Sequence, residues 1–168
     1  MLGRVDDLFA PPDAVWRRVS PRLATARRLS TLVTLVVLTA AVLLALSLIT
    51  GDPALVVSLG AVLALLVAAW SWWFIGRVVT RWGYAERAED LYITRGAMVR
   101  TLVAVPYGRM QFVDVTAGPL DRMLGIATVH LHTASPGTTA VIPGLVAAEA
   151  ARLRDRLTAL GEARAAGL

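Results

Sequence analysis

The side chains that could do chemistry are few in this chain. His130 and His132 stand two residues apart, so on a strand both imidazoles would project from one face. Such a pair can bind a metal ion when further ligands converge on it, but no carboxylate pattern nearby completes a site. The sequence has no cysteine, which excludes disulfides, thiolate catalysis and cysteine-based metal centres. We therefore interpret both histidines as surface residues.

The motifs of common catalytic sites are also missing from the sequence. It contains no glycine-rich phosphate loop, nucleophile elbow, paired-carboxylate pattern or zinc-binding helix motif. We expect a protein that is not an enzyme and that holds no cofactor.

Arginine supplies all of the positive charge. The 17 basic residues contain no lysine and exceed the 12 acidic residues, for a net charge of +5. A basic chain can bind nucleic acid, but no basic stripe interleaved with aromatic residues follows residue 77. Several arginines instead cluster just before an apolar segment, where cations meet anionic lipid headgroups. We expect a lipid bilayer, and no nucleic acid, as a partner.

Two uncharged stretches, 29–51 and 53–76, position everything else. Each is long enough to cross a bilayer, which takes roughly 20 apolar residues of helix. The sequence Thr50-Gly51-Asp52-Pro53 between them is a turn that a helix would not run through. The sequence therefore predicts a membrane helical hairpin with transmembrane helices at 29–51 and 54–76.

Charge at the ends of these helices predicts their orientation. Arginines flank both outer ends, whereas the connecting turn has only Asp52. By the positive-inside rule both termini are cytoplasmic, in a multi-pass protein of the cell (inner) membrane. Aromatic rings and arginines at the expected boundary are interpreted as interface anchors. The predicted anchors are Trp16, Arg27, Arg28, Trp70, Trp72, Trp73, Arg77 and Arg81.

Neither membrane helix carries an ionisable residue, which makes the pair a poor transporter by itself. Gly60, Ala64 and Ala68 recur every four residues, a spacing that lets helix backbones approach closely. This face could pack the hairpin onto itself or support a dimer.

Residues 1–28 form a polar leader that we expect to be cytoplasmic. Asp13 could cap a short helix through Val19, ended by Ser20-Pro21. Trp16 and the arginines after it suit a segment that lies on the membrane surface, although the leader could equally lack fixed structure.

Residues 82–161 are predicted to form a small domain. Leu91 and Ile93 share one face of a first strand, and apolar residues alternate along 97–105, 109–116 and 126–133, with Met110 and Phe112 together on the apolar face of the second of these stretches. Turns are expected at 106–108, 118–119 and 135–137, and a last short strand at 138–142 is ended by Pro143-Gly144. The period then changes to that of an amphipathic helix that stops near Gly161, before a tail at 162–168. This plan is an α+β, PH-like (pleckstrin-homology-like) domain, a small antiparallel β-barrel or sandwich capped by a C-terminal helix. The predicted apolar stripe of that helix is Val146, Ala150, Leu153, Leu157 and Leu160.

A motif in this domain carries a resemblance to a known family. The strings VPYGRMQFVDV (105–115), GPLDRMLG (118–125) and IPGL (142–145) resemble the bacterial membrane-anchored PH-like proteins of the YdbS type. The resemblance covers roughly 29–160. It implies two membrane helices followed by one PH-like domain on the cytoplasmic side, and a partner that is a larger PH-like membrane paralogue.

Six polar residues are candidates for an interaction surface. Arg109, Gln111 and Arg122 lie within the motif and could bind a partner, or could fix the bends by bonding backbone carbonyls. The arginines of the C-terminal helix could be a solvated face, or could lie against the membrane or an acidic partner. The first hairpin, 86–90, is net acidic and would repel a polyanionic headgroup. The helix arginines in question are Arg152, Arg154 and Arg156.

These features predict a membrane-anchored accessory protein. Its PH-like module would dock a protein partner, or a second copy of the chain, at the cytoplasmic face. The alternatives are a module that senses anionic lipid and a small subunit of a larger transport or export complex.

Overall fold

The computed structural model describes residues 14–133 and 140–165. The chain divides into two compact units: residues 24–77 form one, and residues 1–23 together with 78–168 form the other. Several predicted features lie outside the described residues: Asp13, the expected turn at 135–137, the start of the strand expected at 138 and the last three residues of the expected tail.

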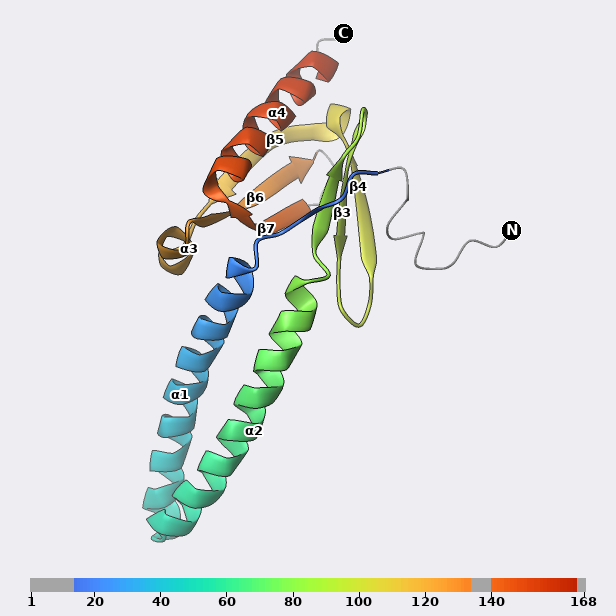
Figure 1. Ribbon diagram of the computed structural model, residues 1–168. Coiled ribbons are helices and arrows are strands. Elements are labelled where there is room, and N and C mark those ends of the chain that lie inside the picture. Colours follow the sequence, from blue (N-terminus) through green and yellow to red (C-terminus); the bar gives the residue numbers. More distant parts are fainter. Residues whose placement is uncertain (1–13, 134–139, 166–168) are drawn as a thin grey trace, which may run out of the picture. The chain divides into compact units, whose positions relative to one another are not determined.

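The first unit is the predicted helical hairpin, made by α1 (Arg22–Thr50) and α2 (Pro53–Val79) (Figure 1). Both helices are long and apolar enough to cross a membrane, and the most apolar 18-residue stretch of each has no residue buried within the protein. Asp52 begins α2 as its cap, because its carboxylate accepts a hydrogen bond from the Leu55 amide at 3.2 Å. Gly51 supplies the turn with a positive φ of 69°.

Both helices extend beyond the uncharged stretches from which they were predicted. Seven residues precede the expected start of α1, and the arginines among them are good helix formers that do not interrupt it. Within the hairpin, Gly60 lies against Leu43, and a Cβ on Gly60 would stand 2.2 Å from Leu43 Cδ2. The face with small residues at four-residue spacing therefore packs the hairpin onto itself.

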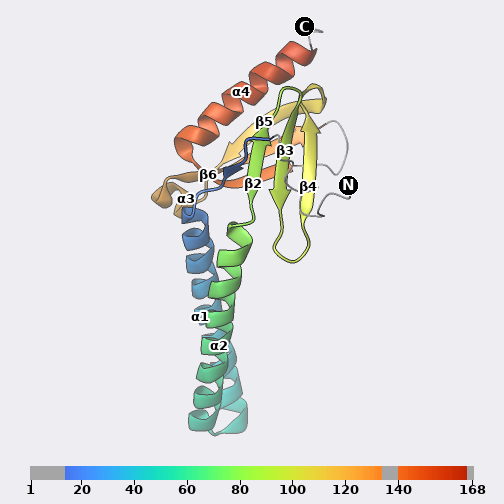
Figure 2. The ribbon, with the colours of Figure 1, turned by 45° about the vertical axis from the view of Figure 1, so that its right-hand side comes forward.

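The second unit contains two antiparallel sheets that do not close into a barrel (Figures 1 and 2). The first has the order β1 (Arg17–Arg18), β2 (Gly83–Glu86), β3 (Asp90–Arg95), β4 (Thr101–Pro106). The second has the order β5 (Met110–Thr116), β6 (Ile126–Thr133), β7 (Ala140–Val146). The 3-10 helix η2 (Tyr107–Arg109), the short helix α3 (Pro119–Leu124) and the C-terminal helix α4 (Ala147–Ala165) complete the unit. This confirms the predicted α+β, PH-like plan.

The core follows the predicted alternation of the strands. Leu91 and Ile93 of β3 are buried together, as are Val129 and Leu131 of β6. Helix α4 packs on β5, β6 and β7, and Ala150, Leu153 and Leu157 of its predicted stripe are fully buried, whereas Leu160 is only partly buried. Burial of one apolar face per element is the main stabilising contribution in such a domain.

The leader differs from the prediction, because no helix runs from residue 14 to 19 among the described residues. Arg17 and Arg18 form β1 and pair with Tyr84 and Gly83 of β2. The chain then packs on the domain, with Val19 and Leu23 buried. Leu23 lies against Gly144, which has a φ of +68° and would place a Cβ 2.5 Å from Leu23 Cβ. Tertiary pairing therefore overrides the local helix signal.

Two strand boundaries also differ from the prediction. Residues 97–100 form a turn, not the start of a strand, because Gly96 adopts a φ of +103° and ends β3. In β5 the register shifts between Met110 and Phe112, so Phe112 is 57% exposed instead of sharing the inner face with Met110. An extra residue in a strand reverses the alternation of side chains beyond it.

The C-terminal boundaries differ as well. Strand β7 continues through Pro143-Gly144 to Val146, and Val146, predicted for the helix stripe, is a half-exposed strand residue. Helix α4 continues past Gly161 to Ala165. Gly161 has no positive φ, and the Tyr107 carbonyl oxygen would lie 3.9 Å from a Cβ there. This glycine keeps helical geometry within α4, so it is not a helix stop.

Candidate functional site

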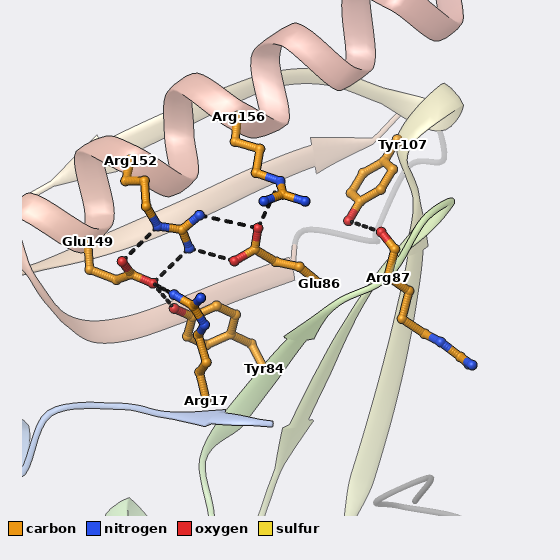
Figure 3. Close-up of polar contacts among 8 residues, drawn as sticks. All are labelled: Arg17, Tyr84, Glu86, Arg87, Tyr107, Glu149, Arg152 and Arg156. Atoms are coloured by element: carbon orange, nitrogen blue, oxygen red, sulfur yellow. Dashed lines mark hydrogen bonds and ion pairs between the residues drawn. The ribbon is translucent and has the colours of Figure 1, made fainter. Parts of the chain in front are cut away.

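Three elements of the domain meet in a cluster of ion pairs (Figure 3). Glu86, the last residue of β2, accepts hydrogen bonds from Arg152 Nη2 at 2.5 Å and pairs with Arg156 Nε at 3.1 Å. Its side chain is only 9% exposed, so its charge requires these partners. Two of the six candidate residues, Arg152 and Arg156, are thus brought together on one carboxylate.

Glu149 is the second acid of the cluster. It accepts hydrogen bonds from Arg152 Nε and from Arg17 Nη1, each at 2.8 Å, and from the Tyr84 hydroxyl. The hydrogen bonds from Arg152, helped by those from Tyr84 and Arg17, lower the pKa of Glu149 to about 2 although burial opposes this. The same acids raise the pKa of Arg152, which stays charged.

Two buried tyrosines border the cluster. Burial, followed by the hydrogen bond to Glu149, raises the pKa of Tyr84 to about 12. Burial and then the charge of Glu86 raise the pKa of Tyr107, whose hydroxyl donates to the Arg87 carbonyl oxygen at 3.0 Å. Both phenols therefore remain neutral donors at ordinary pH.

The cluster joins α4 to β1 and β2, and its chemistry is structural. Glu89 adds a further pair between the same hairpin and α4, with Arg164 Nη2 at 2.9 Å. The sequence shows a net acidic hairpin and a basic helix, and their opposite charges favour such a contact without indicating which residues pair. Arg154 stays apart from the cluster and pairs only with its neighbour Asp155 at 2.7 Å within the described residues.

The candidate residues of the motif are exposed. Arg109 ends η2, Gln111 lies in β5 and Arg122 lies in α3. Within residues 14–133 and 140–165 none of these three side chains has a hydrogen-bond or ion-pair partner, so they do not bond the carbonyls of the bends. They are not brought together into one site, because α3 packs on β6, whereas η2 packs on α4.

Gln111 lines a groove of about 310 Å³ between β5 and the C-terminal half of α4. Phe112 forms one wall, and its exposed ring stacks on His132 with the ring centroids 4.1 Å apart. Sequence reasoning placed Phe112 on the inner face and so missed it, because nothing local signals the register shift. The other lining residues include Met110, Val113, Leu157, Thr158, Gly161 and Glu162.

The two histidines do not converge with other metal-binding side chains in the described part of the chain. His130 Nε2 lies 3.0 Å from Thr116 Oγ1, and His132 stacks on Phe112. Both serve contacts between neighbouring strands.

The predicted anchors divide between the two units. In the hairpin, the Arg28 guanidinium lies 4.4 Å from the ring centre of Trp72, and that of Arg77 lies 4.9 Å from Trp73. Trp70 contacts Trp73 with ring centroids 5.6 Å apart, and all three indoles are at least half exposed. This arrangement suits a membrane interface, where cations and indoles pair. Arg27 also belongs to α1.

The remaining two anchors, Trp16 and Arg81, line a hollow of about 180 Å³ in the second unit. Arg18, Trp82 and Arg100 contribute to the same hollow, although they are distant in sequence. Sequence reasoning did not group them, because only the pairing of β1 with β2 brings the leader to this place.

Comparison with known proteins agrees with this architecture. A family model described as "Bacterial PH domain" matches residues 24–160. The chain is 37% identical to the "UPF0699 transmembrane protein YdbS" of Bacillus subtilis (strain 168) over 98 residues, which cover 52% of this chain and 60% of that protein. The chain thus spans less than two thirds of the length of this relative, and no solved structure matches it. The family match covers most of the sequence, and it agrees with the two apolar helices and with the two-sheet domain capped by α4. The chain is therefore a membrane protein of the bacterial PH domain family.

Proposed function

We propose that the protein is a membrane-anchored, non-catalytic accessory protein whose PH-like domain docks an extended segment of a partner protein along β5. The hairpin fixes the domain at the cell membrane, and the arginines that flank its outer ends favour a cytoplasmic position for the domain and both termini. The observation that carries the proposal is the groove beside an edge strand.

Strand β5 offers main-chain hydrogen bonds to a partner. It pairs with β6 on one side, and among the described residues no strand pairs with its other side. An exposed sheet edge is a template for strand addition, in which the main chain supplies affinity and pockets for alternate side chains supply specificity.

The groove supplies such a pocket for apolar side chains. Met110 and Leu157 line it, and the exposed ring of Phe112 borders it. Exposed aromatic rings in a hollow are frequent anchor points of interfaces. Gln111 adds a donor and an acceptor that no described residue occupies. We expect the partner to be a larger PH-like membrane paralogue or a second copy of the chain.

The alternatives have less support. Lipid sensing through the arginines of α4 requires Arg152 and Arg156 to bind headgroups, but both are paired with Glu86. A role as the small subunit of a transport or export complex requires free small-residue helix faces, but Gly60 already packs against Leu43.

Photo-crosslinking tests the docking site in the intact cell. Phe112 is replaced by p-benzoylphenylalanine, and Met123, an exposed apolar residue of α3, receives the same substitution as a control. We expect a protein adduct at position 112 that is absent at position 123. The adduct should also be lost when Thr158→Arg, a change at an exposed position that lines the groove, fills it. A self-adduct would identify the partner as a second copy. Equal adducts at both positions, or none at 112, would refute docking on β5.

A further inference from the structure

The hollow lined by Trp16, Arg18, Arg81, Trp82 and Arg100 is positively charged. Three arginines line it, of which Arg100 already interacts with another group, and none of the described residues that line it is acidic. Within the described part of the chain, Arg18 and Arg81 take part in no ion pair, in contrast to Arg17, which pairs with Glu149. Guanidinium groups that converge around a small volume suit the oxygens of a phosphate.

Residues of the hollow are close in sequence to the ends of both membrane helices. Arg81 and Trp82 are two and three residues beyond Val79, the last residue of α2, and Arg18 is four residues before Arg22, the first of α1. At no more than about 3.6 Å per residue, Arg81 lies within roughly 10 Å of the end of α2. The ends of membrane-spanning helices lie in the headgroup layer, so the phosphates of lipids are within reach.

An apolar hairpin tip adjoins the hollow. The turn between β3 and β4 begins at Gly96 and ends at Arg100, and both of these residues line the hollow. Between them, Met98 is 86% exposed and Val99 is 79% exposed. Gly96 makes the turn tight, because a Cβ there would lie 1.8 Å from the Val99 carbonyl oxygen. An apolar tip flanked by arginines suits insertion between lipids, with its apolar side chains among the acyl chains.

From these observations we infer that the hollow binds the phosphate group of an anionic phospholipid while Met98 and Val99 insert into the same leaflet. Arg18 and Arg81 are the phosphate ligands, and Trp16 and Trp82 supply rings that suit the headgroup boundary. The site is at the opposite end of β3 from the acidic turn that follows Glu86. It would hold the domain against the membrane independently of any docking on β5.

Lipid binding by the full chain tests the phosphate site. The purified protein in neutral detergent is titrated with phosphatidylglycerol, and bound lipids are counted by native mass spectrometry. The variant Arg18→Gln/Arg81→Gln is compared with Arg109→Gln/Arg154→Gln, which removes equal charge from exposed positions outside the hollow. We expect the first pair to weaken binding at one site roughly tenfold or more, since each arginine near anionic lipid strengthens binding roughly fivefold.

The control pair should bind phosphatidylglycerol like the wild type. Equal binding by all three proteins would overturn the inference, as would equal weakening by both pairs. Glycerol phosphate without lipid tests the source of the phosphate. If it binds as tightly as the lipid and its binding is lost in Arg18→Gln/Arg81→Gln, the site serves a soluble compound and the lipid assignment is wrong.

A spin label tests the insertion of the hairpin tip. Because the chain has no cysteine, Met98→Cys and the control Ala159→Cys, an exposed position of α4, can each be labelled selectively. In proteoliposomes that contain phosphatidylglycerol, we expect the label at 98 to collide with oxygen far more than with a water-soluble nickel chelate, and the label at 159 to show the reverse. Equal preference for the chelate at both positions would overturn the insertion of the tip.

Discussion

At the scale of single residues, acids and arginines explain how α4 is held on the domain. Glu86 and Glu149 form ion pairs with three arginines, one near the N-terminus and two in α4, and the Tyr84 hydroxyl donates a further hydrogen bond to Glu149. Residue types and helical spacing correctly predicted that Ala150, Leu153 and Leu157 of α4 are buried, but wrongly placed Val146, a half-exposed residue of β7, on the same stripe. The pairing itself could not be predicted, because it depends on which hairpin the helix crosses, and this is a property of the tertiary fold.

Loss of the Glu86 charge should destabilise the domain. The variant Glu86→Gln leaves Arg152 and Arg156 without their common acid, and we expect a loss of about 1–3 kcal/mol, less than for a fully buried pair because both arginines are partly exposed. Thermal unfolding of the full chain in detergent, followed by near-UV circular dichroism, measures it. Asp155→Asn, which removes an exposed pair, should change stability by no more than about 0.5 kcal/mol. Equal effects would contradict the role of the cluster.

The same cluster predicts how stability depends on pH. The folded-state pKa of Glu149, about 2, lies below its ordinary value of 4.5, so its contribution is complete above about pH 4.5 and is lost as the pH falls toward 2. The pKa of Tyr84 is raised from 10 to about 12, so its contribution is complete below about pH 10 and is lost as the pH rises toward 12.

Unfolding midpoints across both pH ranges check this dependence. Glu149→Gln should flatten the acid limb, and Tyr84→Phe the alkaline limb. Glu162→Gln, an exposed change elsewhere on α4, is the matched control. An acid limb that stays as steep in Glu149→Gln as in the control would contradict the assignment.

At the scale of elements, the alternating pattern predicted β3 and β6 well, because their buried residues recur at every second position. It failed where the backbone departs from regular pairing, at the shifted register of β5 and at the turn after Gly96. It also failed for β1, whose two residues carry no apolar alternation and form a strand only because β2 is available. The candidate groove depends on the shifted register and was therefore beyond sequence reasoning.

The junction between the leader and β7 gives a prediction at this scale. Gly144→Ala places a Cβ into Leu23 and forces a positive φ on a residue that disfavours it, so we expect a loss of about 2–4 kcal/mol. Gly108→Ala is the control, because its Cβ would make only an ordinary contact at 3.8 Å and no positive φ is involved. Thermal unfolding of both variants in the same detergent measures the difference. Similar midpoints for the two would show that this junction contributes little to stability.

At the scale of the whole molecule, the sequence predicted the architecture because two long uncharged stretches and the switch to alternating strands are strong, local signals. Length and charge predict membrane crossing and orientation without any tertiary information. The assignment of residues 14–23 to the domain was not predictable, because it joins segments on both sides of the hairpin. We infer that the hairpin crosses the membrane and leaves the PH-like domain on the cytoplasmic side.

Cysteine labelling in right-side-out membrane vesicles tests that claim most directly. Thr50→Cys, at the end of α1, and Ala159→Cys, on α4, are each exposed to a membrane-impermeant maleimide before and after the vesicles are opened. We predict that Thr50→Cys reacts in sealed vesicles and that Ala159→Cys reacts only in opened ones. Reaction of Ala159→Cys in sealed vesicles, to the same extent as Thr50→Cys, would contradict the account.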